Sequence, residues 1–314
     1  MPTLTQLNYI VALHRAGHFG KAAAECRVSQ PTLSVQIAKA EAELGFVLFD
    51  RRSKPIMATE HGLGFIAMAR EVLQANARML AAAGRTRTLS GSFHLGVIPT
   101  LAPYVLPWLV GPFAQRCPDV QLTVLERTTS NIVDEITAMR MDAALLATPL
   151  GEATLQRAVL FYDPFYLFAH RSSALLEVGD VDIATINRGD LWLLEDGHCF
   201  RNQVVHLCGL HTRTLLPSVR FEAGSFDTLR GLIDSTGGVT LFPESYVRTL
   251  PAVVQRAQVR AFQDRIPTRE VSLVTHRAHW KTDIVEVIAD IIRQHAPRSL
   301  PRELGKREVL PVLG

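Results

Sequence analysis

Apolar residues recur at helical spacing through the first 83 positions of the chain. The repeat predicts an amphipathic helix over 4–16, a short alanine-rich helix over 21–26, a third helix between Ser29 and Gly45, and one long helix over 60–83. This part of the chain is therefore expected to be almost wholly helical.

The third helix has start and stop signals at its two ends. Ser29 can cap its N-terminus, Pro31 falls in the first turn, where a missing N–H costs little, and Gly45 suits the position that ends a helix. One face is an apolar stripe, made of Leu33, Ile37, Ala40 and Leu44. The opposite face is polar, with Gln30, Thr32, Ser34, Gln36 and Lys39.

A short basic segment, 46–59, follows with a turn expected at 53–55, and indicates a β-hairpin or wing. The long helix after it spans about 36 Å at about 1.5 Å per residue. Because its apolar residues lie on more than one face, we expect it to pair with a second copy of itself. A polar linker, 84–91, ends this half of the chain.

Beyond the linker, strand and helix patterns alternate, which predicts a parallel sheet with crossover helices. The expected strands are 93–98, 121–125, 143–146, 165–170, 238–242 and 271–275. The expected helices are 102–116, 130–140, 227–235 and 283–295. The proline-rich tail has no periodicity and is predicted to be loose.

Composition narrows the class of protein. With 314 residues, 47% of them hydrophobic and 20% charged, the chain is globular, with room for two or three domains. It has no run of about 18 apolar residues, which argues against a membrane span, and no secretory signal is recognisable at its start. Four cysteines are too few for a disulfide scaffold, so we expect a reducing, bacterial-type cytoplasm.

Charge is unevenly distributed along the chain. Residues 1–90 hold 11 Lys and Arg against 6 Asp and Glu, whereas the other 224 residues hold 22 against 24. A basic head with a short helix, a tight turn and a capped helix is typical of a helix-turn-helix that binds DNA. Side chains placed to reach bases or phosphates are Gln30, Pro31, Thr32, Ser34, Lys39, Arg51, Arg52 and Lys54. A helical hairpin that merely packs is the alternative.

The stretch FGKAAAECRVSQPTLSVQIAKAEAELG, with FDRR at 49–52 and Thr59 before Gly62, resembles the LysR-type transcriptional regulators. The resemblance implies an all-α winged helix-turn-helix head, a long linker helix and a two-lobed α/β effector domain like the periplasmic binding proteins. It also implies a linker-helix dimer, assembled to a homotetramer, with Gln30, Pro31 and Ser34 facing the major groove. Ala40 and Pro55 depart from the family pattern.

The boundaries expected from this resemblance divide the chain into five parts. They are the head (1–59), the linker helix (60–85), a hinge (86–91), the effector domain (92–300) and a loose tail (301–314). Within the effector domain, lobe I comprises 92–163 and 268–300, and lobe II comprises 164–267.

Two of the four cysteines lie nine residues apart in the body. Cys199 follows His198 and precedes Arg201, at the start of an expected helix, and such surroundings favour a reactive thiolate. A buried, inert cysteine is the alternative. If 199–208 is one helix, the Cα atoms of Cys199 and Cys208 are about 13.5 Å apart, whereas a disulfide tolerates about 7 Å. Bridging would unwind the segment, through a sulfenic acid on Cys199 that Cys208 attacks.

The segment LLEDGHCFRNQ, followed by Cys208, is similar to the OxyR group of hydrogen-peroxide sensors within this family, as are the segments around Thr100, 225–230 and 238–243. The similarity implies that Cys199 is the peroxidatic cysteine and Cys208 the resolving one. It also implies that Thr100, Thr129 and His198 orient peroxide and water, and that Arg269 stabilises the thiolate. The flanks of Arg269 depart from the group, and Asn202 stands where an aspartate is common.

The resemblance to this family and to its OxyR group predicts a transcription regulator that is not an enzyme and needs no cofactor or metal. Its expected partners are promoter DNA, RNA polymerase, further copies of itself, hydrogen peroxide as the signal, and a thiol reductant such as a glutaredoxin or thioredoxin, with no membrane.

Three other functions stay open on the residues alone. A small molecule between the lobes could be the effector, with Thr100 and Thr129 at helix N-termini and the cysteines incidental. A metal sensor could use the ligand-rich stretch that holds Asp196, His198, Cys199, His206, Cys208 and His211. A Cys–His pair could also be a nucleophile and base in an enzyme, although no third orienting residue is evident.

Overall fold

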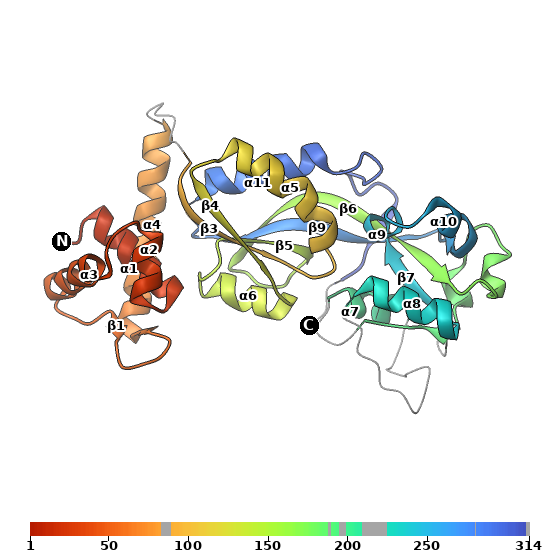
Figure 1. Cartoon of the computed structure of the whole chain (residues 1–314), viewed down its shortest axis with the longest axis horizontal. Helices are drawn as coiled ribbons and strands as arrows, with labels where there is room; N and C mark the ends of the chain where they lie inside the picture. Colours follow the sequence, from red (N-terminus) through yellow and green to blue (C-terminus); the bar gives the residue numbers. More distant parts are fainter. Residues whose placement is uncertain (83–88, 188–189, 195–198, 209–224, 280, 312–314) are drawn as a thin grey trace.

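The computed structural model describes the chain except residues 83–88, 188–189, 195–198, 209–224, 280 and 312–314. A helical head lies at one end and an elongated α/β body extends from it (Figure 1). The head comprises α1 (Leu4–Ala16), α2 (Phe19–Glu25), α3 (Gln30–Leu44), β1 (Phe49–Asp50), β2 (Met57–Ala58) and α4 (Glu60–Ala82). The predicted helices and wing are confirmed.

Local signals account for the ends of the head's helices. Ser29 Oγ accepts the Thr32 backbone N–H at the start of α3, and Gly45, with φ of 78°, ends the helix in the left-handed region. Gly17 ends α1 in the same way, with φ of 58°. The apolar stripe of α3 is buried in the head, with Leu33, Ile37 and Ala40 at its centre. The polar face of α3 is thereby left outward.

The body contains the strands β3 (Gly91–Val97), β4 (Val120–Glu126), β5 (Ala143–Thr148), β6 (Leu155–Ala169), β7 (Val239–Pro243), β8 (Val259–Arg260), β9 (Ile266–His276) and β10 (Arg307–Val309). Its helices are α5 (Ala102–Arg116), α6 (Thr129–Thr137), α7 (Cys199–Cys208), α8 (Phe226–Thr236), α9 (Glu244–Val247), α10 (Ala252–Gln258) and α11 (Thr282–His295), with 3-10 turns η1 (Ala174–Leu176) and η2 (Ile183–Thr185). Among the described residues, no helix is long and apolar enough to cross a membrane.

The sheet runs in the order β4-β3-β5-β9-β6-β7. The expectation of a parallel sheet holds for β3 with β4 and β5, but it is wrong for β9, β6 and β7, which pair antiparallel. The reason is that β6 and β9 are long strands that run through the whole body and pair with each other (Figure 1). Alternation of element types along the chain does not reveal such a return strand.

Two apolar cores lie along this sheet. One gathers around β3, β5, α5 and α11, with Phe93 and Ile288 among its members. The other gathers around β7, α7 and α8, with Phe200 and Leu241. The strands β6 and β9 contribute the residues between the two cores. The body therefore has two lobes joined by a continuous pair of strands.

The described part of the tail contains a strand and a buried residue, contrary to the expectation that 301–314 is loose; residues 312–314 lie outside the described residues. Residues 307–309 form β10, which lies parallel to the first residues of β9, and Leu310 is buried in the second core. A strand of three residues has too little periodicity to be recognised, and its pairing partner lies some 40 positions earlier in the chain. After α11, the chain thus returns to the core that contains α7.

A buried carboxylate joins the head to the body. An oxygen of Asp142, just before β5, lies 3.2 Å from Arg15 Nη1 of α1, and the other lies 3.0 Å from Lys281 Nζ. Burial opposes the ionisation of Asp142, but Lys281 and Arg15 outweigh it and hold the pKa of this carboxyl well below its usual range. His14 of α1 adds a contact of 3.0 Å with the Ala138 carbonyl oxygen.

Candidate functional site

The centre of the candidate site is a guanidinium with no exposure to solvent. Arg269 lies on β9 opposite Asp163 of β6 in the antiparallel register, where the two lobes meet. Its Nε and Nη2 donate to the same Asp163 oxygen at 3.0 and 2.8 Å. A fully buried cation requires such a partner, because an unpaired charge there would be very costly.

Thr100 is held by the same guanidinium. Arg269 Nη1 donates to Thr100 Oγ1 and Nη2 to the Thr100 carbonyl oxygen, both at 3.2 Å. Thr100 is buried and precedes α5, whose N-terminal cap is Leu101, so Thr100 does not cap this helix. Ser245 completes the cluster, because its backbone N–H and hydroxyl both donate to Asp163.

The first turn of α7 packs against this cluster. The Arg269 guanidinium carbon lies 5.8 Å from the centre of the Phe200 ring, which is buried against Phe165 and Phe226. Phe200 directly follows Cys199, so Arg269 and the start of the helix are neighbours. The side chain of Cys199 and all of His198 lie outside the described residues.

The helix expected to start at Cys199 is confirmed, and the condition that 199–208 is one helix is met, since α7 begins at Cys199 and ends at Cys208. At about 1.5 Å per residue, its length separates the two Cα atoms by about 13.5 Å. No disulfide can join them while the helix is intact. Arg201 Nη1 donates to the Leu194 carbonyl oxygen, so part of the Arg201 guanidinium is engaged in a hydrogen bond to the backbone.

Thr129 lies at the N-terminus of α6. It makes none of the described hydrogen bonds to Arg269, Asp163 or Ser245. It is the first residue of that helix, and Thr128 precedes it at the cap position. Its Oγ1 is buried and has no hydrogen-bond partner in the described part of the chain. A buried hydroxyl without a partner is uncommon and is suited to a bound ligand or water.

The other cysteines have different surroundings. Cys117 is buried, and burial raises the pKa of its thiol, as it also does for Cys26 in the head. Of the residues considered for a metal, the described side chains are His206 and Cys208 alone, and no group of three ligands occurs among the described residues. The metal interpretation therefore lies largely outside the described residues.

Sequence reasoning missed Asp163, Ser245 and Phe200. Asp163 had a signal, because it is a carboxylate within the otherwise apolar run FYDPFY and must be neutralised if that run is a buried strand. Ser245 and Phe200 had none, since their importance comes only from what lies opposite them.

The candidate DNA interface is outward-facing. On α3, Gln30, Pro31, Thr32 and Lys39 are exposed and Ser34 is half-buried, and in the wing Arg51, Arg52 and Lys54 are exposed. Arg51 differs from the rest, because its Nη2 lies 2.7 Å from Glu41 Oε2 and its guanidinium lies over the Phe19 ring. Arg51 therefore has a structural role in tying the wing to α3.

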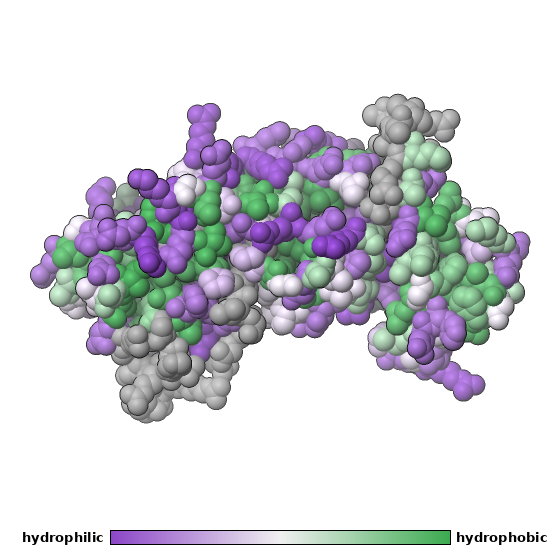
Figure 2. Space-filling view, turned by 180° about the vertical axis from the view of Figure 1, so that it is seen from behind, coloured by the Kyte–Doolittle hydropathy of each residue, from purple (hydrophilic) through white to green (hydrophobic). Residues whose placement is uncertain are grey.

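The linker helix α4 has two apolar faces, as predicted. One face, with Ala69 and Leu73, packs on α1. The other carries Met68, Val72 and Met79, all of them exposed. Figure 2 shows hydrophobic residues gathered on the rear surface of the head.

Comparison with known proteins agrees with this architecture. Residues 4–63 match the model for bacterial regulatory helix-turn-helix proteins of the lysR family, and residues 86–297 match that for the LysR substrate binding domain. The chain belongs to the LysR family of transcriptional regulators. Members of this family are regulators and not enzymes.

Several relatives within the LysR family are named for peroxide. The chain is 32% identical over 300 residues to the hydrogen peroxide-inducible genes activator of Pectobacterium carotovorum subsp. carotovorum, covering 93% of this chain and 96% of the relative. It is 34% identical over 245 residues to the DNA-binding transcriptional dual regulator OxyR of Escherichia coli K12, covering 76% and 78%. The solved structure of full-length OxyR C199D from Pseudomonas aeruginosa is similar with a TM-score of 0.75 and 32% identity, over 94% of this chain and 99% of that one.

Proposed function

We propose that this LysR-type regulator senses hydrogen peroxide by oxidation of Cys199 and then forms a disulfide with Cys208. The observation that carries the proposal is α7 itself, with one cysteine at each end and its first turn packed on the buried Arg269. Relatives named as hydrogen peroxide-inducible activators support the same signal.

The chemistry uses two thiols and one peroxide. The Cys199 thiolate attacks one peroxide oxygen, the O–O bond breaks, and Cys199 becomes a sulfenic acid as hydroxide leaves and takes a proton to form water. Cys208 then attacks the sulfenic sulfur, the S–O bond breaks, and a second water leaves. The peroxide is reduced and the two thiols are oxidised to one disulfide, which a glutaredoxin- or thioredoxin-type thiol reductant returns to the thiols.

The surrounding residues have distinct roles in this step. Arg269 supplies a positive group beside the first turn of α7, tempered by its ion pair with Asp163. The peroxide and a water are positioned by Thr100, which that same guanidinium fixes, by His198, and by Thr129, whose hydroxyl has no partner within the described chain. Because a low-pKa thiolate reacts and a thiol does not, the balance between Arg269 and Asp163 sets the rate of the first step.

The oxidised α7 has to unwind, and we propose that this changes how two effector domains pair. The linker helices carry that change to heads bound on promoter DNA through α3 and the wing, and thereby alter contact with RNA polymerase. The exposed apolar face of α4 supports a homodimer, and a homotetramer follows from pairing between bodies. The protein is expected to act in the cytoplasm, where its DNA is.

The first test is chemical. Reduced protein is treated with about one equivalent of hydrogen peroxide, alkylated, and mapped by mass spectrometry without reduction. We expect a Cys199–Cys208 linkage, with Cys117 untouched because it is buried. In a promoter assay, Cys199→Ser should abolish the peroxide response and Cys117→Ser should retain it; a full response from Cys199→Ser would refute the mechanism.

A small-molecule effector between the lobes is the second candidate. The hydroxyl of Thr129, which has no hydrogen-bond partner among the described residues, favours it, because a position at the N-terminus of α6 suits an anion. If both thiols are recovered unaltered from the peroxide experiment, this candidate replaces the first.

A further inference from the structure

The C-terminal segment 307–310 lies beside the helix that carries both cysteines. It pairs with β9 in parallel register, with Arg307 opposite Ile266 and Val309 opposite Thr268. The Leu310 backbone N–H continues the pairing, donating to the Thr268 carbonyl oxygen at 3.0 Å. The Leu310 side chain is buried in the same core as Phe200 of α7.

One buried hydrogen bond connects this segment to α7. Gln203 has no exposure to solvent, and its Nε2 donates to the Leu310 carbonyl oxygen at 3.1 Å. Its Oε1 is also buried and has no hydrogen-bond partner in the part of the chain that the structure describes. The bond to Leu310 therefore offsets part of the cost of burying this amide. Losing it would leave the Gln203 Nε2 and the Leu310 carbonyl oxygen buried without a partner for this bond.

Gln203 lies on the buried face of α7, between the two cysteines. Phe200, Val204 and Leu207, at helical spacing around it, pack into the second core. Any closure of Cys199 onto Cys208 must break the helix between them, and this interval contains Gln203. The hydrogen bond to Leu310 cannot keep its geometry through that change.

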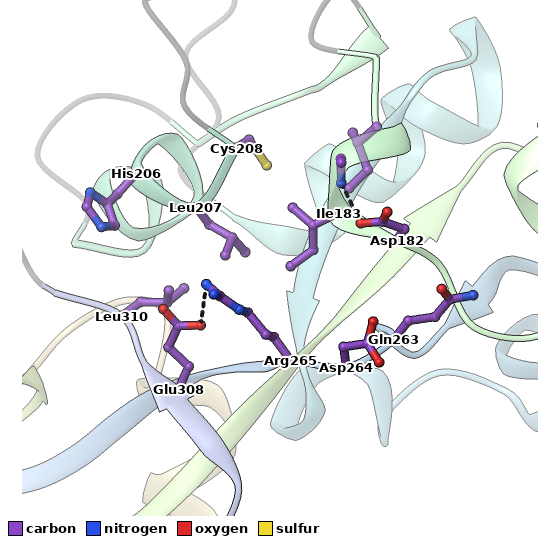
Figure 3. A pocket seen from close by; sticks show the side chains of 12 residues that line it. Asp182, Ile183, His206, Leu207, Cys208, Gln263, Asp264, Arg265, Glu308 and Leu310 are labelled. Atoms are coloured by element: carbon purple, nitrogen blue, oxygen red, sulfur yellow. Dashed lines mark hydrogen bonds and ion pairs between the residues drawn. The ribbon is translucent and has the colours of Figure 1, made fainter.

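The C-terminal end of α7 borders a cavity. A cavity of about 560 Å³ lies between His206, Leu207 and Cys208 of α7 on one side and Glu308 and Leu310 on the other. Figure 3 shows the Cys208 side chain at this cavity, with Arg265 and Glu308, an ion pair 3.4 Å long, among the other side chains that line it. Leu207 and Cys208 pack against the second core, and the hydrogen bond from Gln203 to Leu310 adds a buried polar contact on the same face of the helix.

We infer that residues 307–310 are a latch that holds α7 in its helical position through Gln203 and the buried Leu310, and that the latch lets go when the disulfide closes. Gln203 is thus a positioning residue for Cys208. The holding half of the inference concerns the reduced protein alone, and the release half rests on the proposed function.

Hydrogen–deuterium exchange of the reduced, full-length protein tests the holding half. In Leu310→Ala and in Gln203→Leu, the amides of 204–208 should exchange at least about tenfold faster, and alkylation of Cys208 should accelerate by a similar factor, through local opening of α7. Amides of α11 in the other core should stay protected, which separates local opening from global unfolding. Glu308→Gln is the matched control on the same strand: it removes only an exposed ion pair, and less than about a twofold change is expected.

Two results would overturn the inference. If Leu310→Ala and Gln203→Leu leave exchange of 204–208 at the level of Glu308→Gln, the latch does not hold α7. After peroxide treatment of the unaltered protein, amides of 309–310 should lose protection; unchanged protection with a verified Cys199–Cys208 linkage refutes the release. If no linkage forms, the proposed function and the release both fail, while the holding half is still decided by the reduced protein.

Discussion

Replacing Asp163 by asparagine should lower the free energy of unfolding of the body by more than the same replacement of an exposed aspartate. The carboxylate is fully buried and accepts from Arg269 Nε and Nη2, from the Ser245 N–H and from the Ser245 hydroxyl. In Asp163→Asn, the cation of Arg269 stays buried without a counter-charge, and one acceptor oxygen becomes an NH₂ group that faces donors.

Breaking a buried ion pair from one side typically costs about 3–5 kcal/mol. The native state of a domain is stable by only about 5–15 kcal/mol, so the loss is a large share. The measurement is urea unfolding of Asp163→Asn followed by tryptophan fluorescence, since Trp108 and Trp192 report on the two cores.

Asp290→Asn is the matched control. It makes the same chemical change in an exposed i,i+3 pair with Arg293, where about 0.5 kcal/mol or less is expected. If Asp163→Asn unfolds at the same urea concentration as Asp290→Asn, the argument that this buried pair stabilises the join between the lobes is wrong.

Three further predictions concern acid stability, peroxide binding and DNA. Burial lowers the pKa of His279 from 6.5 to about 4, against the attraction of Asp142. Above pH 6.5 this imidazole is neutral in both the folded and the unfolded state and does not affect stability; as the pH falls towards 4 only the unfolded state takes up the proton, so the folded state loses about 3 kcal/mol. His279→Phe should therefore flatten the stability profile in that window, and an unchanged profile would exclude His279 as the source of the loss. Thr129→Val should leave the unfolding midpoint the same or higher, because it removes a buried hydroxyl with no partner in the part of the chain that the structure describes. It should nevertheless slow Cys199 oxidation by about tenfold if that hydroxyl binds peroxide; an unaltered rate assigns it no role. Lys39→Ala should reduce the slope of log affinity for promoter DNA against log salt by about 0.9, while Lys306→Ala, equally exposed but in the tail, should not change it.

The head was predictable because its signals are local. Helix spacing, the cap at Ser29 and the glycines at positions 17 and 45 act within a few residues, so their consequences appear in the sequence directly. The separation of Cys199 and Cys208 is of the same kind, because the length of a helix depends only on the number of residues in it.

The site itself depended on contacts between distant parts of the chain. Asp163 and Arg269 are 106 positions apart and meet only because β6 and β9 pair antiparallel in one register, and a shift of one residue between the strands would place the two side chains on opposite faces of the sheet. Gln203 and Leu310 are 107 positions apart, and nothing near either residue indicates the other. Local order follows from the sequence alone, whereas pairing across a sheet is chosen by the packing of the whole body, which no short stretch of residues contains.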